Sequence, residues 1–159
     1  MRWLLIALVL LVAALVPVTG ASAQPHAPPI LASGTFQQVG PPAVLASETV
    51  GGITVITQRA QFRLTGTLSG TAVGEQRLTI FPNGTVLGVA EETFTGTVAG
   101  RAGTLQLRTF FTVEGTTIRG QIAILGGTGG LRTVHGQLRA DGSAQTGSGT
   151  YTGLLVVGP

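Results

Sequence analysis

Apolar and polar residues alternate along most of the chain with a period of two. Between positions 104 and 114, one set of alternate residues is mostly apolar and the other mostly polar: Leu105, Leu107, Thr109, Phe111 and Val113 against Gln106, Arg108, Phe110, Thr112 and Glu114. The segments 62–68, 85–98, 117–124 and 134–140 alternate in the same way. Because successive residues of a strand point to opposite faces of a sheet, the pattern predicts strands with one apolar and one polar face.

Turn-forming residues separate these segments. The strongest signal is Pro82-Asn83-Gly84, because an Asn-Gly pair suits a tight hairpin in which both residues have positive φ. Glu114-Gly115-Thr116 and Asp141-Gly142-Ser143 give similar signals. No window of the sequence has a helical repeat of apolar residues. The chain is therefore predicted to be all-β, with about eight antiparallel strands.

A closed barrel and a β-sandwich both fit this alternation. On the polar set lie Arg63, Arg77, Arg108, Arg119 and Arg139, which indicates that one face of each strand is solvated. On the apolar set lie Gly66, Gly88, Gly96, Gly120 and Gly136, and glycine within strands permits the sharp coiling that closure needs. We expect an eight-stranded antiparallel β-barrel, with a β-sandwich as the alternative.

The start of the chain has a different composition from the rest. Arg2 precedes an apolar run from Leu4 to Val16, which is too short to span a bilayer comfortably. Residues 21–23 have the small-x-small pattern that signal peptidase accepts. We expect a signal peptide over 1–23 that is cleaved after Ala23, a proline-rich spacer over 24–32 and the barrel over 33–157. The mature protein would then be secreted or periplasmic, with no membrane association.

Composition excludes several kinds of chemistry. The chain has no Cys, and all of its basic residues are arginines that are dispersed rather than clustered, at a net charge of only +3. Disulfides, thiol nucleophiles, Schiff-base lysines and nucleic-acid binding are therefore not expected. The two histidines, His26 and His135, do not accompany carboxylates in the pattern, so we expect no metal site. No cofactor motif is present either, and we expect no cofactor.

Residues 92–104 (ETFTGTVAGRAGT), residues 126–131 (GGTGGL) and the turn from Phe81 to Gly84 resemble an uncharacterised bacterial domain family. The resemblance extends over residues 33–155, and that family is grouped with the allene oxide cyclase and dirigent-like barrels. It implies an eight-stranded antiparallel barrel that can form homo-oligomers. The family's own activity is not established, and a shared fold does not transfer a reaction.

Glu92 is the main candidate for a functional residue. It belongs to the apolar set with Phe94 and Val98, so it should point into the interior, where a carboxylate has a raised pKa or needs a hydrogen-bond donor. Such a group could act as a general acid or base. The structural alternative is a hydrogen bond to a neighbouring Thr, to a Gln or to a backbone amide. Further candidates for contacts with a ligand in the interior are Gln76, Phe94, Thr109, Phe111 and Tyr151.

Three functions fit these expectations. The first is a barrel that binds a small apolar molecule in its interior, which the many small inward residues favour. The second is a cyclase or isomerase of the allene oxide cyclase type that acts on a lipid-derived substrate, with Glu92 steering charge. The third is a structural or assembly barrel without a ligand. The shortage of catalytic residue types favours binding over catalysis.

Overall fold

Nine antiparallel strands form the described part of the chain, residues 27–158 of a computed structural model. The strands are β1 (Ile30–Gln38), β2 (Ala43–Val50), β3 (Ile53–Gly66), β4 (Leu68–Ile80), β5 (Val86–Val98), β6 (Arg101–Glu114), β7 (Thr117–Gly129), β8 (Val134–Ser143) and β9 (Ser148–Val157). Within this range no helix is long and apolar enough to cross a membrane. The predicted signal peptide lies outside the described residues.

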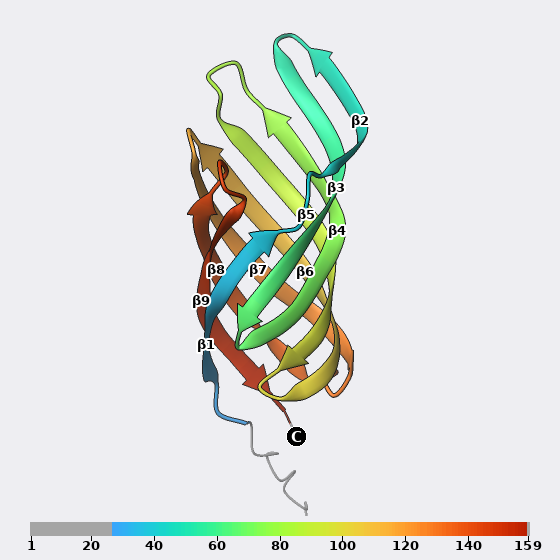
Figure 1. The fold of residues 1–159 in the computed structure, drawn as a ribbon, viewed down its shortest axis with the longest axis vertical. Coiled ribbons are helices and arrows are strands. Elements are labelled where there is room, and N and C mark those ends of the chain that lie inside the picture. Colours follow the sequence, from blue (N-terminus) through green and yellow to red (C-terminus); the bar gives the residue numbers. More distant parts are fainter. Residues whose placement is uncertain (1–26, 159) are drawn as a thin grey trace, which may run out of the picture.

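Eight of the strands close into a barrel, as Figure 1 shows. From β3 to β9 each strand pairs with the next one along the chain, β9 pairs with β1, and β1 pairs with the segment of β3 from Phe62 to Gly66. The remainder of β3, from Ile53 to Arg59, pairs with β2 instead. The hairpin of β2 and β3 therefore rises beyond the barrel (Figure 1). The predicted eight-stranded barrel is confirmed, and β2 is one additional strand.

The first strand begins earlier than the predicted start of the domain. β1 starts at Ile30, and Ala32 is completely buried in the barrel core. Ile30 pairs with Leu155 of β9, so the last residues of the predicted spacer form part of the barrel wall.

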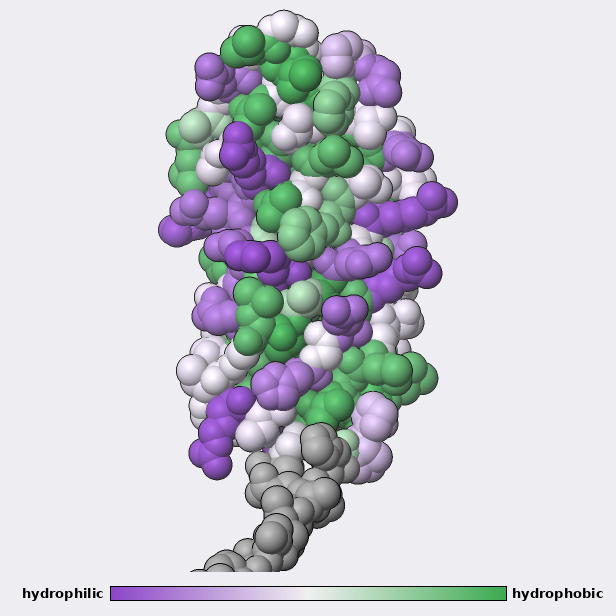
Figure 2. Space-filling model, turned by 180° about the vertical axis from the view of Figure 1, so that it is seen from behind, coloured by the Kyte–Doolittle hydropathy of each residue, from purple (hydrophilic) through white to green (hydrophobic). Residues whose placement is uncertain are grey.

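The predicted distribution of residues between the inner and outer faces is confirmed. On β5 and β6, alternate residues such as Phe94, Leu105 and Leu107 are buried, and all five arginines of the polar set are exposed. The outer face also carries apolar side chains, including Val89 and Phe110, which face each other across β5 and β6. Figure 2 shows hydrophobic and hydrophilic residues interspersed over the rear of the barrel. The two-residue alternation therefore separates the core from a mixed outer surface.

Two predicted turns differ from those in the structure. Residues 141–143 belong to β8, and the chain turns at 144–147 instead. Gly142 pairs with Gly149 of β9, and a Cβ on either glycine would come within 2.8 Å of the Phe36 ring. Glycine at position 142 thus allows close packing within a strand, which the sequence does not distinguish from a turn.

The hairpin between β4 and β5 also has a different form from the one predicted. Only Gly84 has a positive φ there, at 83°. Asn83 instead accepts a hydrogen bond through Oδ1 from the backbone amide of Thr85 at 3.0 Å. Glycine at the last loop position and an Asx-type bond before it are typical of longer hairpin loops rather than of the two-residue type.

Inward aromatic rings lie over glycines of the neighbouring strands. Tyr151 pairs with Gly34, and Phe111 pairs with Gly88. A Cβ added to either glycine would come within 2.5 Å of the facing aromatic side chain. Two of the five predicted inner glycines, Gly88 and Gly96, therefore have a packing role beyond coiling, because the rings of Phe111 and Phe94 occupy the space that their side chains would fill.

The two ends of the barrel interior are packed differently. At one end, here called the packed end, large side chains that are at least 95% buried fill the interior: Leu64, Leu68, Phe94, Val98, Leu105, Leu131, Val134 and Leu155. The turns at 66–67, 99–100 and 130–133 belong to this end. Toward the other end, here called the cavity end, the inner face carries small residues: Ala72, Gly88, Ala90, Gly120 and Ala140. This difference in side-chain size leaves half of the barrel hollow.

Candidate functional site

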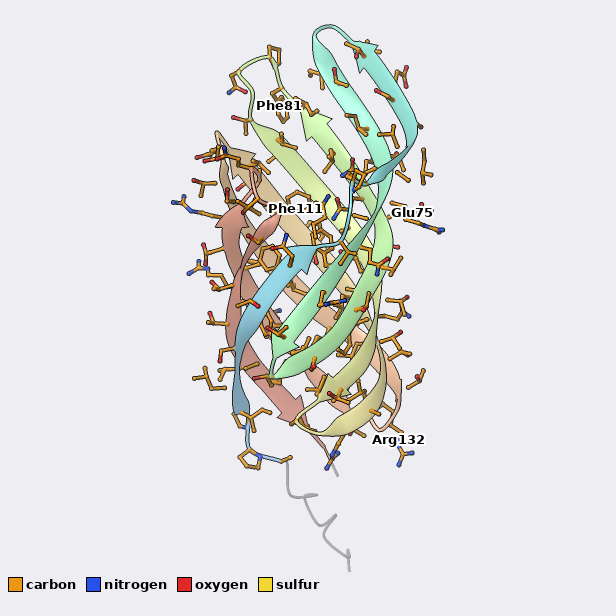
Figure 3. All side chains as sticks on the ribbon, viewed as in Figure 1. Glu75, Phe81, Phe111 and Arg132 are labelled. Atoms are coloured by element: carbon orange, nitrogen blue, oxygen red, sulfur yellow. The ribbon has the colours of Figure 1, made fainter. Side chains whose placement is uncertain are left out.

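A cavity of about 360 Å³ occupies the half of the barrel toward the cavity end. Most of its lining is apolar and includes Phe36, Phe62, Leu78, Phe111, Val113 and Ile122. The lining reaches Ala144 and Gly147 in the turn between β8 and β9. In Figure 3, Phe111 lies within the barrel and Glu75 on its outer surface. The volume falls within the usual range for small-molecule sites, roughly 300–1,000 Å³.

Four polar side chains from adjacent strands form one part of the lining, here called the polar wall: Gln58, Gln76, Glu92 and Thr109. Gln58 on β3 pairs in register with Gln76 on β4, and its Nε2 donates a hydrogen bond to Gln76 Oε1 at 3.0 Å. Thr109 on β6 donates through Oγ1 to Glu92 Oε2 on β5 at 3.2 Å. Each residue of the polar wall therefore has one hydrogen bond within it.

Glu92 is buried, with only 8% of its surface exposed. Burial raises the pKa of its carboxyl group, and the hydrogen bond from Thr109 opposes part of that rise. Among the described residues no donor contacts its second oxygen, Oε1, and no cation pairs with it. Because every fully buried polar side-chain atom of the described chain has a partner, Oε1 must reach the space of the cavity. Glu92 thus combines a structural contact with one oxygen that is available to a ligand.

Replacing Glu92 with glutamine should remove a pH dependence of stability. Because the folded-state pKa is raised above 4.5, the stabilising contribution of the protonated carboxyl is fully present below pH 4.5 and is lost as the pH rises through the folded-state pKa. We expect Glu92→Gln to have a larger free energy of unfolding than the wild type at neutral pH, and little difference at pH 4. Urea unfolding at both pH values measures this.

Glu91→Gln is the matched control for that measurement, because the Glu91 side chain is 68% exposed on the outer face. It should not reproduce the stabilisation at neutral pH. A wild type that is more stable than Glu92→Gln at pH 7 would show that contacts of the ionised carboxylate outweigh its desolvation.

The structure brings together most of the predicted site residues. Glu92, Gln76, Thr109, Phe111 and Tyr151 all line the cavity. Phe94 does not: it is completely buried toward the packed end, and its ring lies over Gly70 and Gly96, where an added Cβ would approach it within 3.0 Å.

Tyr151 contributes its ring rather than its hydroxyl to the cavity. The hydroxyl accepts a hydrogen bond from the backbone amide of Leu68 at 2.9 Å and donates one to the carbonyl of Thr65 at 2.8 Å. Burial raises the pKa of this hydroxyl, and the hydrogen bond to Leu68 lowers it in part. The two partners flank the turn between β3 and β4, so the hydroxyl holds that turn against β9.

Sequence reasoning missed Gln58, Phe36 and Phe62 as cavity residues. Gln58 lies four residues before Phe62 and therefore on the same face of the strand. Continuing the inner-facing positions of that strand toward its start would have identified it. Phe36 lies on β1, and its ring packs edge-to-face on Phe62 with ring centres 6.3 Å apart. That contact depends on the closure between β1 and β3, which a local pattern does not specify.

Every charged side chain of residues 27–158 other than Glu92 lies on an exposed residue. Two exposed ion pairs link neighbouring strands, Arg59 with Glu75 at 3.5 Å and Arg108 with Glu91 at 2.6 Å. His135 is exposed on β8, and within the described range no three potential metal ligands gather. The cavity lining contains neither Arg nor His. The interior of the barrel therefore carries one acidic group without a basic counterpart.

Comparison with known proteins finds a family model and a solved structure that are similar to this chain. A family model described as "Protein of unknown function (DUF3224)" matches residues 32–153. Among solved structures, a protein of unknown function from this family in Shewanella oneidensis MR-1 superposes with a TM-score of 0.69. The match covers 83% of this chain and 99% of that one at 20% identity, so it supports the fold alone. The comparison with curated proteins gives no match. Because the family model covers most of its length, the chain belongs to the DUF3224 family of proteins of unknown function.

Proposed function

We propose that the barrel binds a small apolar molecule in its cavity. The observation that carries this proposal is the hollow half of the barrel, about 360 Å³ with a mostly apolar lining and a polar wall. Eight-stranded barrels are wide enough to hold one small ligand, and ligand sites typically combine apolar walls with a few polar groups that fix orientation. The predicted signal peptide adds export to the proposal, so the ligand would be bound outside the cytoplasm.

The distribution of inner side chains supports binding over a purely structural role. Protein interiors are normally close-packed, and the packed end of this barrel meets that standard with leucine, valine and aromatic residues. At the cavity end, inner positions such as Ala72, Ala90 and Ala140 carry one methyl group where a larger apolar residue would fill the space. A barrel that served only as a scaffold would be more stable with those positions filled.

Co-purification of a ligand tests the proposal directly. The protein is purified in its exported form without detergent, extracted with organic solvent, and the extract is analysed by mass spectrometry. We expect one apolar compound, or one closely related series, in a reproducible ratio to the protein. An extract from repeated preparations that contains no such compound would contradict the proposal and leave the structural role.

Filling the cavity should abolish the co-purified compound. Ala90 is 1% exposed and lines the cavity, so Ala90→Leu adds apolar volume to the space that a ligand would occupy. We expect at least a tenfold fall in bound compound, which corresponds to about 1.4 kcal/mol of lost binding free energy. The matched control is Val89→Leu, one residue earlier on the outer face, which should retain the compound. Equal loss in both variants would place the binding elsewhere.

One observation favours a second candidate, an isomerase of the allene oxide cyclase type. Glu92 Oε1 reaches the cavity, and a carboxyl group with a raised pKa can exchange a proton with a bound substrate. The resemblance to the allene oxide cyclase barrels points in the same direction. Once the compound is identified, Glu92→Gln should abolish its turnover at saturating concentrations of the compound if the protein is an enzyme. Unchanged turnover in that variant would remove this candidate.

A further inference from the structure

Glu92 gives the proposed binding site a definite charge preference. It is the one ionisable side chain of the cavity lining apart from Tyr151, whose hydroxyl is bonded to the backbone of Thr65 and Leu68. The lining has no Arg or His, and the whole sequence has no Lys. An ionised carboxylate in an apolar cavity without a cation is energetically costly, so the carboxyl group either takes up a proton or pairs with a cation. A ligand is the remaining source of that cation.

The surroundings of Glu92 leave its second oxygen without a partner in the described chain. Facing positions on the two adjacent strands are Gly74 on β4 and Leu107 on β6, and neither offers a side-chain donor. Thr109 donates to Oε2, and the amide nitrogen of Gln58 donates to Gln76 rather than to Glu92. The charged residues of the same strands, such as Glu91 and Arg108, are exposed on the outer face. Oε1 is therefore placed to accept a hydrogen bond from a ligand.

Aromatic rings complete a lining that suits a cation. Phe36 and Phe62 pack edge-to-face at 6.3 Å, and both line the cavity together with Phe111 and the ring of Tyr151. The faces of aromatic rings are electrostatically negative and attract ammonium groups. One carboxylate and several aromatic rings of the lining thus attract a positively charged group. The lining has no positively charged group that could attract a carboxylate ligand.

We infer that the ligand is an apolar amine, with a protonated amino group that donates to Glu92 Oε1 and a hydrocarbon body that fills the rest of the cavity. This inference rests on the proposed function and names the chemical class of the ligand. A free fatty acid is disfavoured by the same geometry, because its carboxylate would lie in an apolar space that already holds an acidic group and offers no cation. Burial raises the pKa of Glu92, and a bound ammonium group would restore its ionised form.

Three probes with the same hydrocarbon chain test the inference: octylamine, octanol and octanoic acid. Their dissociation constants for the wild-type protein are measured by isothermal titration calorimetry at neutral pH. Because hydrogen bonds to charged groups are stronger than neutral ones, we expect octylamine to bind about tenfold more tightly than octanol or better. Octanoic acid should bind most weakly of the three.

Two variants locate the source of the preference. Glu92→Gln should reduce the affinity for octylamine to that for octanol and leave octanol binding within about threefold of wild type. Glu91→Gln, which changes the adjacent exposed carboxylate, should retain the preference for the amine. Thermal unfolding followed by circular dichroism confirms that both variants are folded.

The outcomes separate this inference from the proposed function. Binding of octanol without a preference for octylamine, or a preference that survives Glu92→Gln, would overturn the inference and leave the binding barrel intact. Binding of none of the three probes to the wild type would overturn both. Tightest binding of octanoic acid would also overturn the inference.

Discussion

Truncating Phe94 to alanine should lower the free energy of unfolding by about 3–5 kcal/mol, the range for deleting a fully buried aromatic ring. The ring is completely buried and belongs to the apolar core between β4, β5 and β6. Gly70 and Gly96 lie beneath it, and glycines have no side chains that could move into the space left by the ring. The resulting void should therefore remain open. Urea unfolding monitored by circular dichroism measures the change.

Phe110→Ala is the matched control for this prediction. Phe110 lies on β6, the strand next to Phe94, but it points to the outer face and is 53% exposed. Exposed substitutions usually change stability by less than about 1 kcal/mol. If Phe94→Ala loses as little stability as Phe110→Ala, the core near Phe94 relaxes around the truncation. If Phe110→Ala loses as much stability as Phe94→Ala, the outer face contributes more than its exposure indicates.

Replacing Tyr151 with phenylalanine should cost about 1–3 kcal/mol, because it leaves a buried backbone amide without an acceptor. In the wild type the amide of Leu68 donates to the Tyr151 hydroxyl, and that hydroxyl donates to the carbonyl of Thr65. The variant keeps the ring over Gly34, so the loss reports on the hydroxyl alone. Hydrogen exchange at the Leu68 amide should accelerate in parallel with the fall in stability.

The control for Tyr151→Phe removes a hydroxyl near the same turn from the exposed side. Thr35 Oγ1 and Thr65 Oγ1 lie 2.7 Å apart on the outer face, where water can replace either partner. Thr35→Val should therefore change stability by less than about 0.5 kcal/mol. Unchanged exchange at Leu68 in Tyr151→Phe would contradict the role of the hydroxyl in holding the turn.

Alternation predicted the strands because each strand of the barrel has one solvated face, and the glycines on the inner set favoured closure over a sandwich. Arg108 and Leu107 illustrate this, since adjacent residues of β6 have opposite exposures. β2 was not predicted because all eight of its residues are exposed, so its sequence has no alternation of apolar and polar residues that separates an inner face from an outer one. The turn predicted at 141–143 was wrong, since glycine serves close packing in strands as well as reversal of the chain.

The candidate site was predictable only in part, because alternation gives the direction of a side chain and not its depth along the barrel. Glu92 and Phe94 share the inner set of β5, yet Glu92 lines the cavity and Phe94 packs in the core. The contact between Thr109 and Glu92 depends on the register of β5 with β6, in which Glu92 faces Leu107. The length of the turn after Val98 sets that register, and no local pattern of apolar residues specifies it.

Both ends of the described chain emerge at the packed end of the barrel (Figure 1). Ile30 pairs with Leu155, and Val134 beside the turn at that end pairs with Val157. A tag, linker or solid support attached at either terminus would therefore lie on the opposite side from the hairpin loops around the cavity. The barrel could be anchored to a sensor surface by either terminus with its hollow half facing the solution.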